Sequence, residues 1–197
     1  MGTDRLEEQM AFILEVEGLK QIFRQTLLPG DKRPENDAEH SWHLALMAIL
    51  LMEHARVPDL DLLTVLKMVL IHDIVEIDAG DTFAYDEVGN QDKEEREQAA
   101  ADRLFNLLPA EQAVAIRALW DEFEQRMTPE AQYAAALDRL QPLLLNFHTN
   151  GAAWRQHGVK KAQVIARNEH IQEGAPALWQ YARRLIDRAV ECGYLAE

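Results

Sequence analysis

The chain has 197 residues, of which 48% are hydrophobic and 27% charged, a profile typical of globular rather than disordered or fibrous proteins. Its 34 acidic residues outnumber 20 basic ones, giving a formal charge of −14. Such a surface should repel polyanions, so we expect no nucleic-acid polymer as a partner. The longest apolar stretch, 44–52, is shorter than the roughly 20 residues that span a bilayer, which predicts no membrane partner.

The two ends of the chain favour a cytoplasmic location. The first ten residues are polar and acidic, so we expect no signal peptide. Cys192 is the single cysteine, which excludes an intrachain disulfide and suits a reducing compartment. We interpret this cysteine as structural rather than nucleophilic.

Helical periodicity runs through most of the chain, and strand signals are absent. The predicted helices cover approximately 4–28, 37–56, 58–80, 90–108, 109–127, 128–148, 160–172 and 175–191. No repeat, linker or change of composition marks a second domain. The sequence therefore predicts an all-α fold, a compact bundle of about seven to nine helices, as one domain over 1–197. Its core motif region covers 19–148, and its C-terminal helices cover 150–197.

The most highly charged predicted helix, 90–108, alternates acidic and basic residues. Pairs at a spacing of four, such as Lys93 and Glu97, are typical of a solvated helix face. We therefore assign no chemistry to this helix.

The segment 68–81, MVLIHDIVEIDAGD, places His72, Asp73 and Glu76 where an apolar helix stripe should continue. A buried, ionised carboxylate is costly unless it is paired or bound to a metal. On a helix, His72 and Asp73 can both border one site, and Glu76 lies one turn further along the same face as His72. This spacing lets two groups hold a metal while the third reaches a bound water.

A second histidine opens the predicted helix that begins with Asp37 as its N-cap. His40 continues through Leu44 and Met47 as one helix stripe, so it should face the interior. In the first helical turn, the helix dipole disfavours the imidazolium, and the neutral ring can bind a metal. A core histidine that bonds a backbone carbonyl is the alternative. His43 has a comparable stripe, and periodicity does not choose between the two histidines.

Asp138 is a carboxylate on an otherwise apolar helix face, and Arg139 beside it should point elsewhere. Pairing with a distant arginine and metal ligation both remain open for this residue. Taken together, these residues offer two nitrogens and two oxygens, a set that suits a divalent ion such as Mn, Co, Fe, Ni or Zn. The signatures of competing chemistries, a Gly-rich phosphate loop, HExxH and G-x-S-x-G, are absent from the sequence.

At these residues the sequence resembles the HD-domain metal-dependent phosphohydrolase superfamily, whose pattern is H…HD…D, and within it the 5′-deoxynucleotidase branch. The resemblance extends from about Leu19 to Asp138. It implies that the first metal ligand is His40, within Glu39-His40-Ser41, rather than His43. It implies further that His72, Asp73 and Asp138 complete the ligand set around one divalent ion, which could also be Mg.

The resemblance also implies roles for residues around the metal. Glu76 and Asp81 would act as catalytic groups that move protons. Arg24 would orient the substrate phosphate through its guanidinium group. Gln25 stands where the deoxynucleotidases have a tryptophan that helps to reject a ribose 2′-hydroxyl, so the choice between ribose and deoxyribose stays open.

The function implied is the release of phosphate from a small phosphomonoester, first of all a nucleoside or deoxynucleoside 5′-monophosphate. The alternatives are a nucleotide pyrophosphohydrolase or phosphodiesterase on the same scaffold, a non-catalytic ligand-binding HD module and, more distantly, an iron-dependent oxygenase. We interpret the remaining histidines, at 54, 148, 157 and 170, as surface or packing residues. Relatives suggest a homodimer, and exposed apolar faces of the C-terminal helices could form it.

Overall fold

The computed structural model describes residues 4–30, 33–86 and 88–197. Its α-helices are α1 (Arg5–Val16), α2 (Asp37–Leu51), α3 (Leu62–Ile71), α4 (Glu76–Ala79), α5 (Lys93–Phe105), α6 (Ala110–Gln125), α7 (Pro129–His148), α8 (Ala152–Gln156), α9 (Lys161–Asn168), α10 (Ile171–Gly174) and α11 (Pro176–Glu191). Glu17–Gln21 and Met52–His54 are short 3₁₀ helices, and β1 (Phe23–Leu27) and β2 (Pro34–Asn36) form a small ribbon. Nine of these described α-helices have five or more residues, which confirms the predicted all-α bundle.

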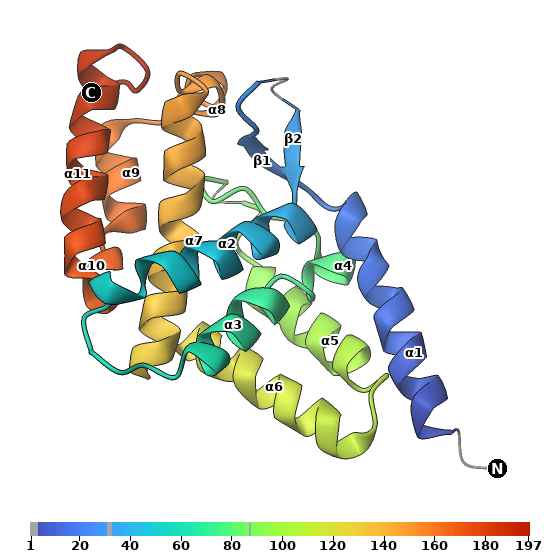
Figure 1. Ribbon diagram of the computed structural model, residues 1–197. Coiled ribbons are helices and arrows are strands. Elements are labelled where there is room, and N and C mark those ends of the chain that lie inside the picture. Colours follow the sequence, from blue (N-terminus) through green and yellow to red (C-terminus); the bar gives the residue numbers. More distant parts are fainter. Residues whose placement is uncertain (1–3, 31–32, 87) are drawn as a thin grey trace.

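Helix α7 is the centre of the bundle. It packs against α2, α3 and α6 on one side and α10 and α11 on the other, and Figure 1 shows it between these two groups. The Thr128 side chain caps its first turn by accepting from the Ala131 backbone N–H, and Pro129 occupies the first helical position. The small residues 134–136 are all buried. Twelve of its residues are buried, so a polar side chain on α7 points into the protein interior unless it lies at an end.

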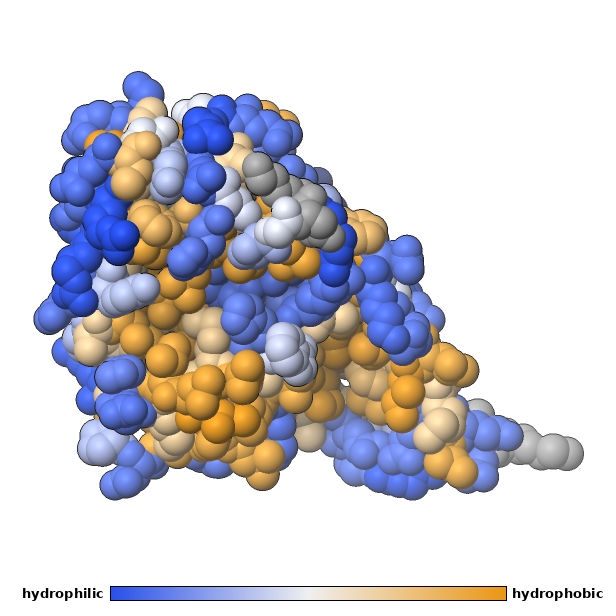
Figure 2. Space-filling model, turned by 45° about the horizontal axis from the view of Figure 1, so that its top comes forward, coloured by the Kyte–Doolittle hydropathy of each residue, from blue (hydrophilic) through white to orange (hydrophobic). Residues whose placement is uncertain are grey.

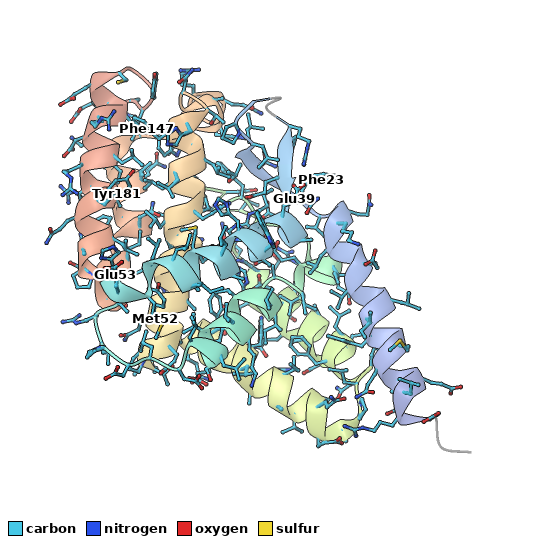
Figure 3. The ribbon with its side chains drawn as sticks, viewed as in Figure 1. Phe23, Glu39, Met52, Glu53, Phe147 and Tyr181 are labelled. Atoms are coloured by element: carbon cyan, nitrogen blue, oxygen red, sulfur yellow. The ribbon has the colours of Figure 1, made fainter. Side chains whose placement is uncertain are left out.

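The predicted helix over 4–28 is wrong in its second half. Helix α1 ends at Val16, and Phe23–Leu27 forms a strand that pairs antiparallel with Pro34–Asn36. The apolar spacing that suggested one continuous helix face breaks at Phe23, which is half exposed. Ile22, Phe23 and Thr26 are residues that favour strands, and the partner strand satisfies the backbone of this segment. Figure 3 shows Phe23 close to Glu39, where the ribbon meets the start of α2.

The predicted helix over 58–80 is interrupted at the residues of most interest. Helix α3 ends at Ile71, and a tight turn over 72–75 leads into α4. In this turn the N–H groups of Ile74 and Glu76 donate to carbonyls three residues earlier rather than four. The indole Nε1 of Trp120, on α6, donates to the His72 carbonyl at 3.1 Å and fixes the turn from outside.

Smaller differences concern helix ends and the surface. The N-cap of α2 is Asn36, which forms a capping box with Glu39, so the predicted cap Asp37 is the first helical residue and is buried. Cys192 is exposed rather than part of the core. Among the residues that the structure describes, no helix is long and apolar enough to cross a membrane.

The exposed large apolar side chains lie mainly away from the C-terminal helices, contrary to the expectation from sequence. Of the described residues of α9–α11, Tyr181 is the one large apolar side chain that is exposed, because the apolar residues of α11 face the core. Helices α2 and α3, in contrast, expose one shared apolar face, visible as the orange area over these helices in Figure 2. The exposed residues of this α2–α3 face are Trp42, Leu46, Ile49, Leu50, Leu63 and Leu70.

Candidate metal centre

Three parts of the chain bring the four predicted ligands together. His40 lies in the first turn of α2, His72 and Asp73 follow α3, and Asp138 lies in the middle of α7. The Asp138 Oδ1 atom is 3.0 Å from His40 Nε2 and 3.7 Å from His72 Nε2. His72 Nε2 is also 3.2 Å from Asp73 Oδ1. All four side chains are buried, so they form a compact site of two imidazoles and two carboxylates.

The hydrogen bonding of His72 suits a metal ligand. Its Nδ1 lies 3.0 Å from the Val69 carbonyl oxygen, and since a carbonyl only accepts, Nδ1 carries the hydrogen. Nε2, the ring nitrogen that can present a lone pair, faces the oxygens of Asp73 and Asp138, which are acceptors too. This Nε2 is buried and has no hydrogen-bond partner among the described residues. A cation between these lone pairs would satisfy all of them, so the donor set fits a divalent metal.

The orientation of His40 is set by a buried amide. Gln141, one turn after Asp138 on α7, donates from Nε2 to Glu35 Oε1 at 2.6 Å. Its Oε1 therefore faces His40 Nδ1 at 3.1 Å and accepts from it. Gln141 Nε2 also lies 3.2 Å from His43 Nδ1. His43 thus contacts the amide and not the four-residue site, whereas His40 directs Nε2 into it.

Negative charge dominates the centre. Burial and the Arg24 charge lower the pKa of His40, but the hydrogen bonds that its ring donates to Asp138 and Glu35 and the charge of Asp73 outweigh them and raise it to about 9. A proton on His40 therefore supplies the positive charge that the carboxylates require. A metal ion would compete with that proton for the same nitrogen. The ligand atoms of His40, His72 and Asp73 lie within 4.8 Å of one another, a spacing that one ion can bridge.

Arg24 and Gln25 lie on strand β1 and line the same cavity as His72, Asp73 and Asp138. Arg24 Nη1 lies 2.7 Å from Asp73 Oδ2 and 3.2 Å from Asp37 Oδ1. The guanidinium thus lies directly beside the centre, although on a strand rather than on the predicted helix. Gln25 is exposed at the cavity wall.

Glu76 and Asp81 face the cavity from the chain that follows the histidine–aspartate pair. Glu76 begins α4 and is buried, and its Oε2 has no hydrogen-bond partner in the described part of the chain. Burial, followed by the charges of Asp73 and Asp37, raises the pKa of Glu76 well above its ordinary value. Burial also raises the pKa of Asp81, although the Arg24 charge opposes it. A carboxyl group with a raised pKa can hold a proton near neutral pH and give it up.

Sequence reasoning missed several residues that shape this site. Asp37 is not the helix cap that the sequence predicts: its buried carboxylate pairs with Arg24, and burial first of all raises its pKa to about 7. Gln141 has a signal that could have found it, because its spacing of three from Asp138 places both on one face of α7. Glu35 precedes the helix on β2, and the pattern of residues gives no hint that it is buried.

Two further predictions near the centre are wrong. Helix α5 is not purely a solvated surface, because Glu97 is buried and lines the cavity with Lys93, to which it is paired at 3.2 Å. Arg139 does not point away from Asp138: its Nη2 lies 3.6 Å from Asp138 Oδ2, and it lines the cavity too. A long side chain can fold back past its own helix face, which the angle between adjacent positions does not show.

Comparison with known proteins decides the family. The family model described as HD domain matches residues 16–179, most of the chain. The chain belongs to the HD-domain family. The four residues predicted as its H…HD…D pattern, His40, His72, Asp73 and Asp138, all lie within the matched region.

Individual relatives refine this placement. The chain is 29% identical over 123 residues to "5′-deoxynucleotidase HDDC2" of Xenopus laevis, which covers 62% of this chain and 57% of that protein. It is 27% identical over 113 residues to the Homo sapiens protein of the same name, covering 57% of this chain and 53% of that one. These matches therefore span little more than half of the curated relatives' length.

Solved structures of similar proteins cover nearly the whole HD-domain chain. A crystal structure from Magnetospirillum magnetotacticum MS-1, described as a "Predicted metal-dependent phosphohydrolase", is 55% identical and has a TM-score of 0.94. It covers 98% of this chain, which in turn covers 96% of it. The PH0347 protein from Pyrococcus horikoshii OT3 is 20% identical with a TM-score of 0.65, over 93% of this chain and 99% of that one, and shows the shared fold alone.

Proposed function

We propose that this HD-domain protein is a metal-dependent phosphohydrolase that releases phosphate from a small phosphomonoester, first of all a nucleoside or deoxynucleoside 5′-monophosphate. The observation that carries the proposal is the buried His72 Nε2, which has no hydrogen-bond partner in the described structure and faces two carboxylates. The names of the relatives, 5′-deoxynucleotidases and a metal-dependent phosphohydrolase, support the same chemistry.

The proposed cofactor is one divalent ion, Mn, Co, Fe, Ni, Zn or Mg, held by His40, His72, Asp73 and Asp138. Such an ion lowers the pKa of a bound water and polarises a phosphoryl oxygen. The mixture of imidazole nitrogen and carboxylate oxygen accepts several of these ions. Gln141 and the Val69 carbonyl keep both histidine rings oriented with Nε2 toward the centre.

The chain's own residues supply binding and proton transfer. Arg24 is placed to bind phosphate oxygens, because its guanidinium lies beside Asp73 and lines the cavity. Glu76 is the better candidate for the proton donor to the leaving alkoxide, since it is buried and its pKa is raised well above its ordinary value. Asp81, which is less buried, is the candidate to accept a proton from the attacking water. Gln25 could bond the sugar hydroxyls at the cavity wall.

We further propose that the protein is cytoplasmic, as its single cysteine suggests, and that it forms a homodimer through the α2–α3 face. The apolar side chains 42, 46, 49 and 50 follow one face of α2, and Leu63 and Leu70 extend this face on α3. A contiguous exposed apolar area of this kind is typical of a protein–protein interface. Met52 and Glu53, labelled in Figure 3, lie in the 3₁₀ helix that follows α2.

The test is release of inorganic phosphate from a panel of ribo- and deoxyribonucleotides with Mn, Co, Mg, Ni and Zn. We expect turnover by the wild type with at least one of these ions, and loss of turnover and weaker metal binding in Asp138→Ala, with an unchanged helical circular dichroism spectrum. Wild-type turnover in Asp138→Ala with bound metal would contradict the ligand assignment. Release of pyrophosphate would favour the pyrophosphohydrolase alternative, and failure to take up any metal would favour a non-catalytic module.

A further inference from the structure

Two arginines face the metal-centre cavity from the side of the C-terminal helices. Arg139 follows Asp138 on α7, and Arg167 lies near the end of α9. Both line the metal-centre cavity and also a second hollow walled by α5, α6 and α7, which Asp138 borders as well. The arginine pair therefore lies where the two hollows adjoin, beside one of the candidate metal ligands.

Each of these two arginines has a buried donor that the described protein atoms leave without an acceptor. The Nε atoms of Arg139 and Arg167 are buried and have no hydrogen-bond acceptor among the described residues. Arg139 has one carboxylate nearby, Asp138 at 3.6 Å, which is also a candidate metal ligand. This differs from Arg24, which has Asp73 and Asp37 as close partners.

Further positive charge lies near the pair, although the carboxylates of Glu97, Glu124 and Asp138 line the same hollows. Burial and the charge of Arg139 lower the pKa of Arg167 to about 10. Burial and the charges of Arg139, Arg126 and Arg167 lower the pKa of His170 to about 4, so this ring is neutral and adds no charge. Two partly buried like charges with unused donors are unfavourable unless an anion lies between them.

We propose that Arg139 and Arg167 form a subsite for a second phosphate group of the substrate, beside the phosphate held by Arg24 and the metal centre. The inference rests on the proposed phosphohydrolase function and extends its substrate class to nucleotides that carry a second phosphate group. Phosphate is the ligand that fits, because it offers several acceptor oxygens and two charges to two planar guanidinium groups. The contact of Arg139 with Asp138 places the second phosphate close to the reacting one.

Arg167 is the residue to test, since Arg139 adjoins a candidate metal ligand and its loss could disturb the metal. Calorimetry would compare inorganic pyrophosphate with inorganic phosphate, with Mg²⁺ held in excess over either anion. We expect the wild type to bind pyrophosphate about tenfold more tightly than phosphate. Arg167→Ala should abolish this preference, and Arg167→Lys should restore part of it through charge alone. The control, Arg184→Ala, removes an exposed arginine of α11 that lines neither hollow, and should retain the preference.

The outcomes separate this inference from the proposed function. Equal affinity of the wild type for both anions, or an equal loss for both in Arg167→Ala, would overturn the second subsite even if nucleotide monophosphates are hydrolysed. A preference for pyrophosphate that depends on Arg167, in a protein that releases phosphate from no nucleotide, would support the subsite and contradict the function. Displacement of bound pyrophosphate by a nucleoside 5′-diphosphate or by a nucleoside 3′,5′-bisphosphate then shows where the second phosphate is attached. The compound that fits the subsite is the one whose binding Arg167→Ala weakens.

Discussion

Arg24 Nη1 lies 2.7 Å from Asp73 Oδ2, so the arginine proposed to bind the phosphate contacts a carboxylate proposed to bind the metal. A second carboxylate, that of Asp37 at the start of α2, lies 3.2 Å from the same nitrogen through its Oδ1. Because Arg24 is on a two-stranded ribbon at the edge of the bundle, these two contacts fix its position over the centre. Binding of a cation by Asp73 would weaken one of them and leave Asp37 as the remaining anchor.

Asp37→Asn should therefore impair substrate binding more than chemistry. The amide keeps the shape of the side chain but loses the charge that holds Arg24, so we expect KM for the phosphate substrate to rise about three- to tenfold. We expect kcat to change by less than about threefold. Steady-state kinetics of phosphate release would measure both, with Glu191→Gln, an exposed residue of α11, as the charge-matched control. An unchanged KM, or a fall in kcat alone, would show that Asp37 does not position Arg24.

The chain of buried bonds from Glu35 through Gln141 to His40 gives a second prediction. Gln141→Leu removes the acceptor that orients the His40 ring, and such outer contacts contribute about 10- to 100-fold to metal affinity. We expect a loss of that size for Mn²⁺ or Co²⁺ in a competition titration with a metal-binding dye. Gln180→Leu, an exposed change on α11, should bind metal like the wild type. Wild-type metal affinity in Gln141→Leu would mean that His40 is oriented by packing alone.

The charges of the centre predict how stability depends on pH without metal. Burial lowers the pKa of His40, but the hydrogen bonds that its ring donates to Asp138 and Glu35 raise it from an ordinary 6.5 to about 9. A group whose pKa is raised in the folded state adds to the unfolding free energy. For His40 this contribution is fully present below pH 6.5 and is lost as the pH rises to about 9. Asp37, whose pKa burial raises to about 7, changes stability in the same direction at lower pH.

The metal-free protein should therefore lose roughly 2–3 kcal/mol of unfolding free energy between pH 6.5 and about 9. A bound metal takes the place of the His40 proton, so the metal-loaded protein should lose much less. Thermal unfolding of EDTA-treated and metal-loaded samples across this range would measure the difference in Tm, which should widen as the pH rises. A metal-free Tm that is constant or increases with pH would contradict the assigned charge balance.

The residues around the metal show what sequence can and cannot predict. His40 and Asp138 were found because a polar side chain on an apolar helix stripe needs a partner, and α2 and α7 form as the stripe requires. The turn over 72–75 is not predicted because its residues fit a helical pattern, and the break appears only in the structure, in the backbone hydrogen bonds and the contact with Trp120. The ribbon was missed because a strand of five residues in a helical context takes its stability from pairing with residues distant in sequence. Arg139 and Arg167, on different helices, line the same hollows through tertiary packing that no local period encodes.

The proposed homodimer can be tested on the α2–α3 face without touching the metal centre. Ile49 and Leu50 are neighbours on α2, with 54% and 63% of their surface exposed, and neither lines the metal-centre cavity. Both side chains are solvated in the monomer, so the double change Ile49→Glu and Leu50→Glu should alter the Tm of the monomer by little. The two charges that it adds to each subunit oppose burial of this face between two copies. Sedimentation equilibrium should show a dimer for the wild type and a monomer for this variant. The control places the same two charges at Val114 and Met127, which are exposed near the ends of α6, and should leave the dimer intact. A wild-type monomer, or a dimer that persists in the α2 variant, would show that this face is not the interface between subunits.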